Sequence, residues 1–168
     1  MKTRQALLAL MIAALAPAAL AQTAISASTT TSTSTSSTTT STTTAAAVSV
    51  NGIVSGQPES VSFSGQVRLN AKVVTDPDFG NPPTVVLSID LSSITGVGSS
   101  TGKKYVVANQ ETLNRRLSAA DTVQVNFPFY PSGGSAMSSR IGTASLNLSF
   151  NVNTLQLTAA SGEITSPQ

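Results

Sequence analysis

The sequence predicts an all-β protein, built as an antiparallel β-sandwich of about seven to nine strands. Apolar and polar residues alternate with a period of two in five stretches, which places the apolar side chains of each stretch on one face of a strand. Turns rich in Gly, Pro, Asn and Ser separate these stretches, and convincing crossover helices are missing between them. A small closed β-barrel is the alternative architecture, because it uses the same alternation.

Residues 1–21 have the organisation of a signal peptide. Lys2 and Arg4 precede an uncharged apolar run, and Ala19 and Ala21 supply the small side chains that signal peptidase recognises. The apolar run is shorter than the roughly 20 residues that a spanning helix needs. We therefore expect cleavage after Ala21, export to the periplasm, the cell surface or the medium, and no transmembrane segment in the mature chain.

The charge balance excludes one class of partner. Two of the nine basic residues leave with the signal peptide, so seven basic and seven acidic residues remain in the mature chain. Because no basic excess is left to neutralise phosphates, we expect no nucleic-acid partner. The chain contains no cysteine, so the exported domain must be stabilised by packing without disulfides.

Residues 22–44 are rich in serine and threonine, and we expect them to form a disordered linker ahead of a single β domain at 45–168. Within 26–44 every residue except Ala27 is Ser or Thr. Such a tract buries too little apolar area to offset the entropy lost on ordering. Threonine has a high strand propensity, so addition of part of the tract to a sheet edge is the alternative.

The first elements of the domain precede and include its longest strand. A first strand or small hairpin is predicted at 45–56, where apolar residues flank the turn-forming pair Asn51 and Gly52. The stretch 59–74 has apolar residues at odd positions and polar residues at even positions, which is typical of a long strand with one buried face. Gly65 interrupts the apolar face, and we expect a bend or a bulge there.

The middle of the chain contains two further strands. After a turn rich in Pro and Asp at 76–83, alternation resumes at 84–92, and a Gly/Ser loop at 94–102 leads to another strand at 105–108. Residues 109–120 fit a helical face and a strand equally well. The sequence therefore allows at most one short helix, near 109–120.

The last strands are clearer. Residues 122–130 alternate, and a Gly/Ser loop follows at 131–139. Residues 144–152 and 155–159 then form two alternating stretches around a turn, which predicts a terminal hairpin.

No intact catalytic motif is present. Gly98, Ser100 and Gly102 match the nucleophile-elbow pattern, and Ser100 with Lys103 matches a Ser-x-x-Lys pattern. A Ser-His triad needs an imidazole, and the chain has no histidine. We therefore expect no catalytic residue, no cofactor and a non-enzymatic protein. Paired carboxylates remain as an alternative, a hydrolase using Glu111 with Asp121 or Asp90.

Asp76 and Asp78 form a weak calcium candidate, since two carboxylates two residues apart can supply oxygen ligands. Calcium takes about six to eight oxygens, and the next acidic residue is Asp90. Asp and Asn also favour ordinary turns, so we expect a turn here and no metal site.

Three residues are candidates for contact with a ligand or partner. Tyr130 precedes a Pro/Gly turn and can project from it to stack on a sugar or peptide. Lys103 and Lys104 form a basic pair at the end of the glycine-rich loop. A concave, polar pocket near 98–104 and 131–139 would support a binding role for these loops.

Together these features predict an exported, non-enzymatic β-sandwich module with a binding, adhesive or structural role behind a Ser/Thr-rich spacer. Its partner would be a protein or a glycan. A small barrel that binds an apolar ligand and a carboxylate-based hydrolase are the alternatives. The sequence leaves the partner, the oligomeric state and glycosylation of the Ser/Thr tract open.

Overall fold

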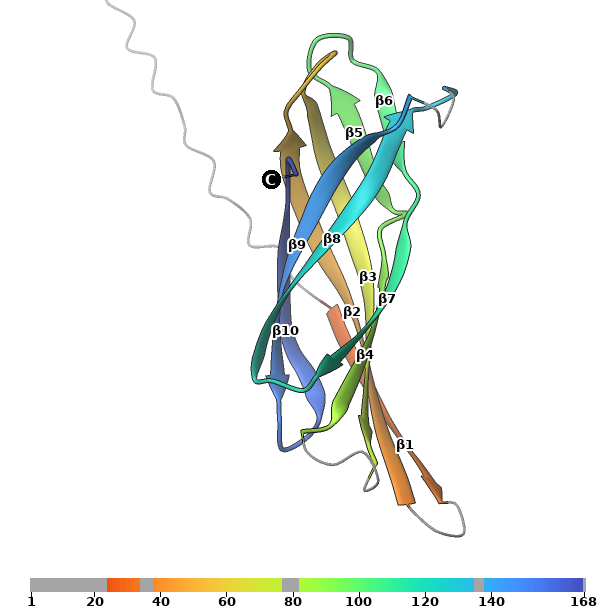
Figure 1. Ribbon diagram of the computed structural model, residues 1–168, viewed down its shortest axis with the longest axis vertical. Helices are drawn as coiled ribbons and strands as arrows, with labels where there is room; N and C mark the ends of the chain where they lie inside the picture. Colours follow the sequence, from red (N-terminus) through yellow and green to blue (C-terminus); the bar gives the residue numbers. More distant parts are fainter. Residues whose placement is uncertain (1–23, 34–37, 77–81, 135–137, 168) are drawn as a thin grey trace, which may run out of the picture.

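A computed structural model describes residues 24–33, 38–76, 82–134 and 138–167. The described residues form ten β-strands and no helix, which confirms the all-β prediction (Figure 1). No helix in this part of the chain is long and apolar enough to cross a membrane. The signal peptide predicted at 1–21 lies outside the described residues.

All ten strands belong to one sheet with the order β1-β2-β10-β9-β8-β6-β5-β3-β4-β7. Because β2 also pairs with β3, the pairings of seven strands run in a ring from β2 through β10, β9, β8, β6, β5 and β3 back to β2. The strands are β1 Ala24–Thr33, β2 Thr38–Val54, β3 Val61–Thr75, β4 Thr84–Asp90, β5 Ile94–Gly98, β6 Lys104–Val107, β7 Gln110–Arg116, β8 Ala120–Pro131, β9 Arg140–Asn151 and β10 Gln156–Thr165.

Strand β3 organises the sheet. One edge pairs with β2 over the whole of β3, while the other edge pairs first with β5 and then with β4. Gly65 lies where the partner changes, and a Cβ there would come within 2.5 Å of the Ser93 carbonyl oxygen. The register with β2 continues through Gly65 without a shift, so of the expected bend or bulge the bulge is absent. Glycine serves instead to let the β4–β5 connection approach the backbone of β3.

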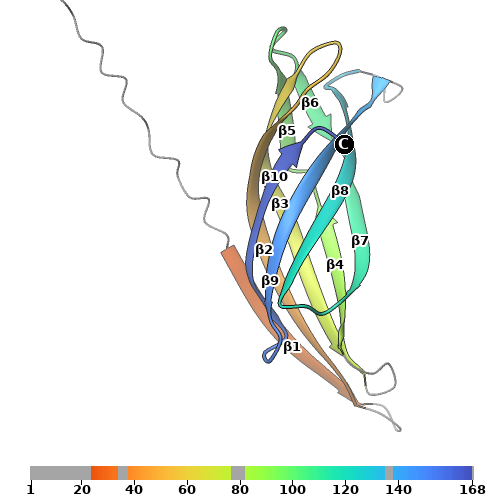
Figure 2. The ribbon, with the colours of Figure 1, turned by 60° about the vertical axis from the view of Figure 1, so that its left-hand side comes forward.

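The core lies between the two curved halves of the sheet (Figure 2). Three phenylalanine rings fill it near the loops at one end: Phe63 packs edge-to-face against Phe129 at 4.9 Å and against Phe127 at 5.7 Å between centroids. All three are at most 1% exposed. The even-numbered polar residues of β3 lie on the opposite, outer face, as the alternation predicts.

Two phenylalanines lie over glycines on the neighbouring strand. Phe63 is the register partner of Gly96, and Phe127 is the register partner of Gly142. A Cβ on either glycine would come within 2.6 Å of the facing ring. The missing side chains therefore provide the space that the rings occupy, and they fix which residues can face each other.

The Ser/Thr tract differs from the expected linker. Residues 24–33 form β1, and 38–44 form the first part of β2, so the boundary expected at residue 45 falls inside a strand. Thr42 and Thr44 are only 3% and 1% exposed, because they face the core beside the apolar residues of β3. Addition of the tract to the sheet, the alternative interpretation, matches this part of the structure. Residues 34–37 lie outside the described residues.

Two ambiguous segments are also strands. Residues Gln110–Arg116 form β7, so the helix allowed near 109–120 is absent, and Leu113 follows the strand alternation towards the core. Asn51 and Gly52 continue β2 instead of making a hairpin, because Gly52 packs against the backbone of Ile164 where β10 pairs with β2.

Candidate functional site

The loop between β5 and β6 is wrapped around the carboxylate of Glu59, which precedes β3 and is 7% exposed. The backbone N–H groups of Ser100 and Thr101 donate to Oε2 at 2.9 and 3.0 Å. The hydroxyls of Thr101 and Tyr105 donate to Oε1 at 2.6 and 3.0 Å. Four donors from one hairpin therefore converge on a single carboxylate and hold the loop in one conformation.

These donors determine the ionisation of Glu59. The Thr101 hydroxyl, followed by the two N–H groups and Tyr105, lowers the pKa of Glu59 to about 2, against the opposing effect of burial. Burial and the adjacent carboxylate raise the pKa of Tyr105, so its hydroxyl stays protonated and donates. Arg140 donates to the Glu59 carbonyl at 2.7 Å and lies over the Phe129 ring at 5.1 Å, which ties β9 to the same place.

The nucleophile-elbow pattern has a structural explanation. Gly98 leaves room for the Glu59 carboxylate, which a Cβ at this position would overlap, and Gly102 adopts a positive φ of 66° in the turn. Ser100 is exposed in a hairpin that joins two strands, whereas an elbow joins a strand to a helix. The glycines at this spacing therefore fit a carboxylate-binding turn.

The structure brings Lys103 and Lys104 beside the turn at 131–134. Together they line a hollow of about 370 Å³, and the Ser132 N–H donates to the Lys104 carbonyl at 2.8 Å. Both lysines are exposed. Tyr130 is half-buried in β8 opposite Val106 and does not line this hollow. The hollow thus brings together two of the three predicted contact residues, Lys103 and Lys104, but not Tyr130.

The predicted acidic sites are not assembled among the described residues. Asp76 accepts a hydrogen bond from the Thr39 hydroxyl at 3.3 Å, while Asp78 lies outside the described residues. Groups of three or more His, Cys, Asp or Glu side chains that could hold a metal ion are absent from the described part of the chain.

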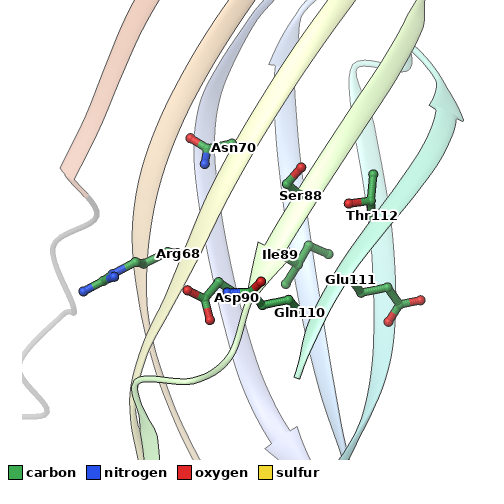
Figure 3. A pocket seen from close by; sticks show the side chains of 8 residues that line it. All are labelled: Arg68, Asn70, Ser88, Ile89, Asp90, Gln110, Glu111 and Thr112. Carbon is green, nitrogen blue, oxygen red and sulfur yellow. The ribbon is translucent and has the colours of Figure 1, made fainter. Parts of the chain in front are cut away.

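The carboxylates considered for hydrolysis also lie apart. Asp121 forms a bidentate pair with Arg115, with N–O distances of 2.8 and 3.0 Å. Asp90 and Glu111 point to opposite faces of the sheet, because Asp90 pairs with Gln110 while Glu111 pairs with the core residue Ile89. In Figure 3 the Glu111 carboxylate points away from Asp90.

A larger hollow lies on the outer face of β3, β4 and β7, a region that sequence reasoning did not identify (Figure 3). Its volume is about 440 Å³. Six polar side chains, two from each strand, form two rows across the strands, because the strand register places them directly opposite one another. The rows are Arg68–Asp90–Gln110 and Asn70–Ser88–Thr112.

A second hollow of about 350 Å³ continues the first towards β1 and shares Arg68 and Asn70 with it. Small residues extend both rows here: Ala47 beyond Arg68, and Ala45 and Ser26 beyond Asn70. We call the two hollows together the outer trough. At about 4.8 Å between neighbouring strands, its five strands give it a length of about 19 Å.

Comparison with protein-family models, with curated proteins and with solved structures found no match. The interpretation of the outer trough therefore depends on its own chemistry.

The two polar rows of the outer trough carry one positive and one negative side chain, Arg68 and Asp90. The Ser92 hydroxyl and N–H, followed by Arg68 and Gln110, lower the pKa of Asp90, so this carboxylate is ionised at neutral pH. Arg68 is exposed and forms no ion pair within 4 Å among the described residues. Figure 3 shows its guanidinium extending away from Asp90, towards the side of β1 and β2. The trough thus contains a cation, an anion and four neutral hydrogen-bonding side chains.

Proposed function

We propose that this chain is an exported, non-enzymatic β module that binds an uncharged, hydroxyl-rich polymer, a neutral polysaccharide, in the outer trough. The observation that carries the proposal is the pair of polar rows across β3, β4 and β7. A ligand lying across the strands meets a hydrogen-bonding group about every 4.8 Å along each row.

The types of group favour a neutral sugar. Sugar hydroxyls both donate and accept, so they can donate to the Asp90 carboxylate and accept from the Arg68 guanidinium and the Asn70 amide. An anionic polymer would gain from Arg68 but would be repelled by Asp90. The small residues on β1 and β2 let a flat ring approach the backbone closely.

The two alternative functions have less support. A barrel that carries an apolar ligand needs an internal cavity, but near one end the interior is filled by Phe63, Phe127 and Phe129. A carboxylate-based hydrolase needs two acids at one place, and Asp90, Glu111 and Asp121 lie on different faces or in an ion pair.

Affinity electrophoresis in native gels tests the proposal. The mature chain is run in gels that contain soluble starch, a mixed-linkage β-glucan or a galactomannan, with alginate as the anionic comparison. We expect retardation by at least one neutral polymer. Arg68→Ala should weaken binding roughly 10-fold or more, since a hydrogen bond from a charged donor contributes about 1.5–3 kcal/mol.

Lys72→Ala is the matched control. Lys72 is also exposed on the outer face of β3, two residues beyond Asn70, and the substitution removes the same charge without touching the trough. We expect it to bind like the wild type. Loss of binding in Lys103→Ala/Lys104→Ala, with Arg68→Ala unaffected, would move the site to the loop end and contradict the proposal.

A further inference from the structure

The ring of pairings leaves two strand edges unpaired among the described residues, and they differ in character. Strand β1 pairs only with β2, and β7 pairs only with β4. An unpaired edge presents a row of backbone N–H and C=O groups that can pair with another strand. Soluble proteins usually protect such edges with charges, prolines or bulges.

The β7 edge is protected by charge, whereas the β1 edge is not. Strand β7 carries Glu111, Arg115 and Arg116 within seven residues. Strand β1 has ten residues without charge or proline, and its register with β2 is continuous over all ten. The side chains of residues 25–31 are exposed on both faces. Among the described residues, strand β1 therefore offers a continuous edge without charge or proline to a partner strand.

We infer that the β1 edge pairs antiparallel with the β1 edge of a second copy of this chain, forming a symmetric dimer with one continuous sheet. Charge and symmetry favour a second copy of β1 as the partner strand. Two copies of an uncharged strand bring no like charges together, and a two-fold axis makes each strand the partner of its own equivalent. A charged partner strand would find no counter-charge on β1.

Such a dimer would also fix where the two outer troughs lie relative to each other, and this step rests on the proposed function. Antiparallel strands of two identical copies are related by a two-fold axis perpendicular to the sheet, so both outer faces lie on the same side. The outer trough ends at Ser26 on β1. With residues 28 and 30 opposite each other, Ser26 of one copy lies opposite residue 32 of the other, so the two troughs would lie on the same side of the sheet but about six residues, roughly 20 Å, apart along β1. Separate segments of one long polymer could occupy both troughs, which raises avidity.

The test measures mass against concentration for the mature chain, without polysaccharide, by sedimentation equilibrium. We expect twice the monomer mass at high concentration and dissociation on dilution. Ser28→Lys/Thr30→Lys should remain monomeric, because the added lysines face the same lysines across the two-fold axis. Ser62→Lys/Ser64→Lys adds the same charge on the outer face of the interior strand β3 and should dimerise like the wild type.

Deuterium uptake provides a second readout that does not depend on a variant. Amides of residues 24–33 should exchange more slowly at dimer concentrations than after dilution, while those of β7 stay unchanged. A wild-type chain that remains monomeric at all concentrations, a lysine variant that still dimerises, or growth beyond a dimer would overturn the inference. Arg68→Ala should dimerise normally, so loss of polysaccharide binding and loss of pairing are distinguished.

Discussion

Replacing Gly96 by alanine tests the register that holds the two halves of the core together. An alanine Cβ would lie 2.6 Å from the Phe63 ring and 2.7 Å from a Val61 methyl group. Real Cβ atoms do not approach carbon so closely, so the ring has to move inside a packed core. Overpacking of this kind costs about 1–3 kcal/mol.

The companion substitution Phe63→Leu removes the obstructing ring. It forfeits two edge-to-face contacts, with Phe129 and Phe127, each worth about 0.5–1.5 kcal/mol, so we expect a loss of about 1–3 kcal/mol. In the double variant the alanine methyl occupies space that the ring has vacated. The combined loss should therefore be smaller than the sum of the single losses by about 1 kcal/mol or more.

Urea denaturation of the four proteins, followed by far-UV circular dichroism, gives these free energies of unfolding. Thr95→Ala is the control, because this neighbouring side chain points outwards, and it should stay within about 0.5 kcal/mol of the wild type. Additive losses, or a neutral Gly96→Ala, would show that Phe63 does not lie over Gly96 and that the β3–β5 register is different.

Three further predictions concern other parts of the chain. Thr42→Lys should lower stability by about 2 kcal/mol or more in urea denaturation, because it buries a charge. The neighbouring outward substitution Ser41→Lys should be nearly neutral, because the register partners of Ser41, Thr30 and Val74, are uncharged. Equal, small effects would mean that this tract is a linker. The wild type should be more stable than Glu59→Gln above pH 4.5, because a lowered pKa in the folded state stabilises the fold wherever the carboxyl of the unfolded chain is already ionised. Urea denaturation at a series of pH values should show this difference in stability declining as the pH falls towards about 2. A difference that stays constant with pH would contradict the hydrogen-bonded carboxylate. A double-mutant cycle between Arg115 and Asp121 should give a coupling of only about 0.2–1 kcal/mol, because the Arg115 side chain is 41% exposed; a coupling of several kcal/mol would indicate a buried pair.

Side-chain alternation predicts most of the strands, because each of them has one buried face. It fails for Ile94–Gly98, which is strand β5 and not part of the loop expected at 94–102, because two of its three inward positions are glycines. The odd positions of 61–73 predict the inner face of β3, and Leu113 fits the alternation of β7 once the helix is set aside. Alternation does not predict the pairing of Phe63 with Gly96, because this pairing joins residues far apart in sequence. No local pattern in either strand specifies that contact, although a glycine within an apolar strand is a signal that something large lies over it.

The Ser/Thr tract was misjudged because composition describes a segment without its neighbours. Thr42 and Thr44 become buried only because the long strand β3 continues beside them, opposite Val73 and Ala71. The outer trough was missed for a related reason. Its polar residues are the expected outward side chains of three strands, and only the register of those strands turns them into two rows.

A nuclear magnetic resonance titration tests the central claim most directly. A soluble oligosaccharide from the neutral polymer that retards the chain is added to the isotope-labelled protein without residues 1–21, and amide shifts are followed residue by residue. We expect the changes to cluster at Arg68, Asn70, Ser88, Asp90, Gln110 and Thr112. Changes confined to Lys103, Lys104 and 131–134, or no changes at saturating oligosaccharide, would contradict the account.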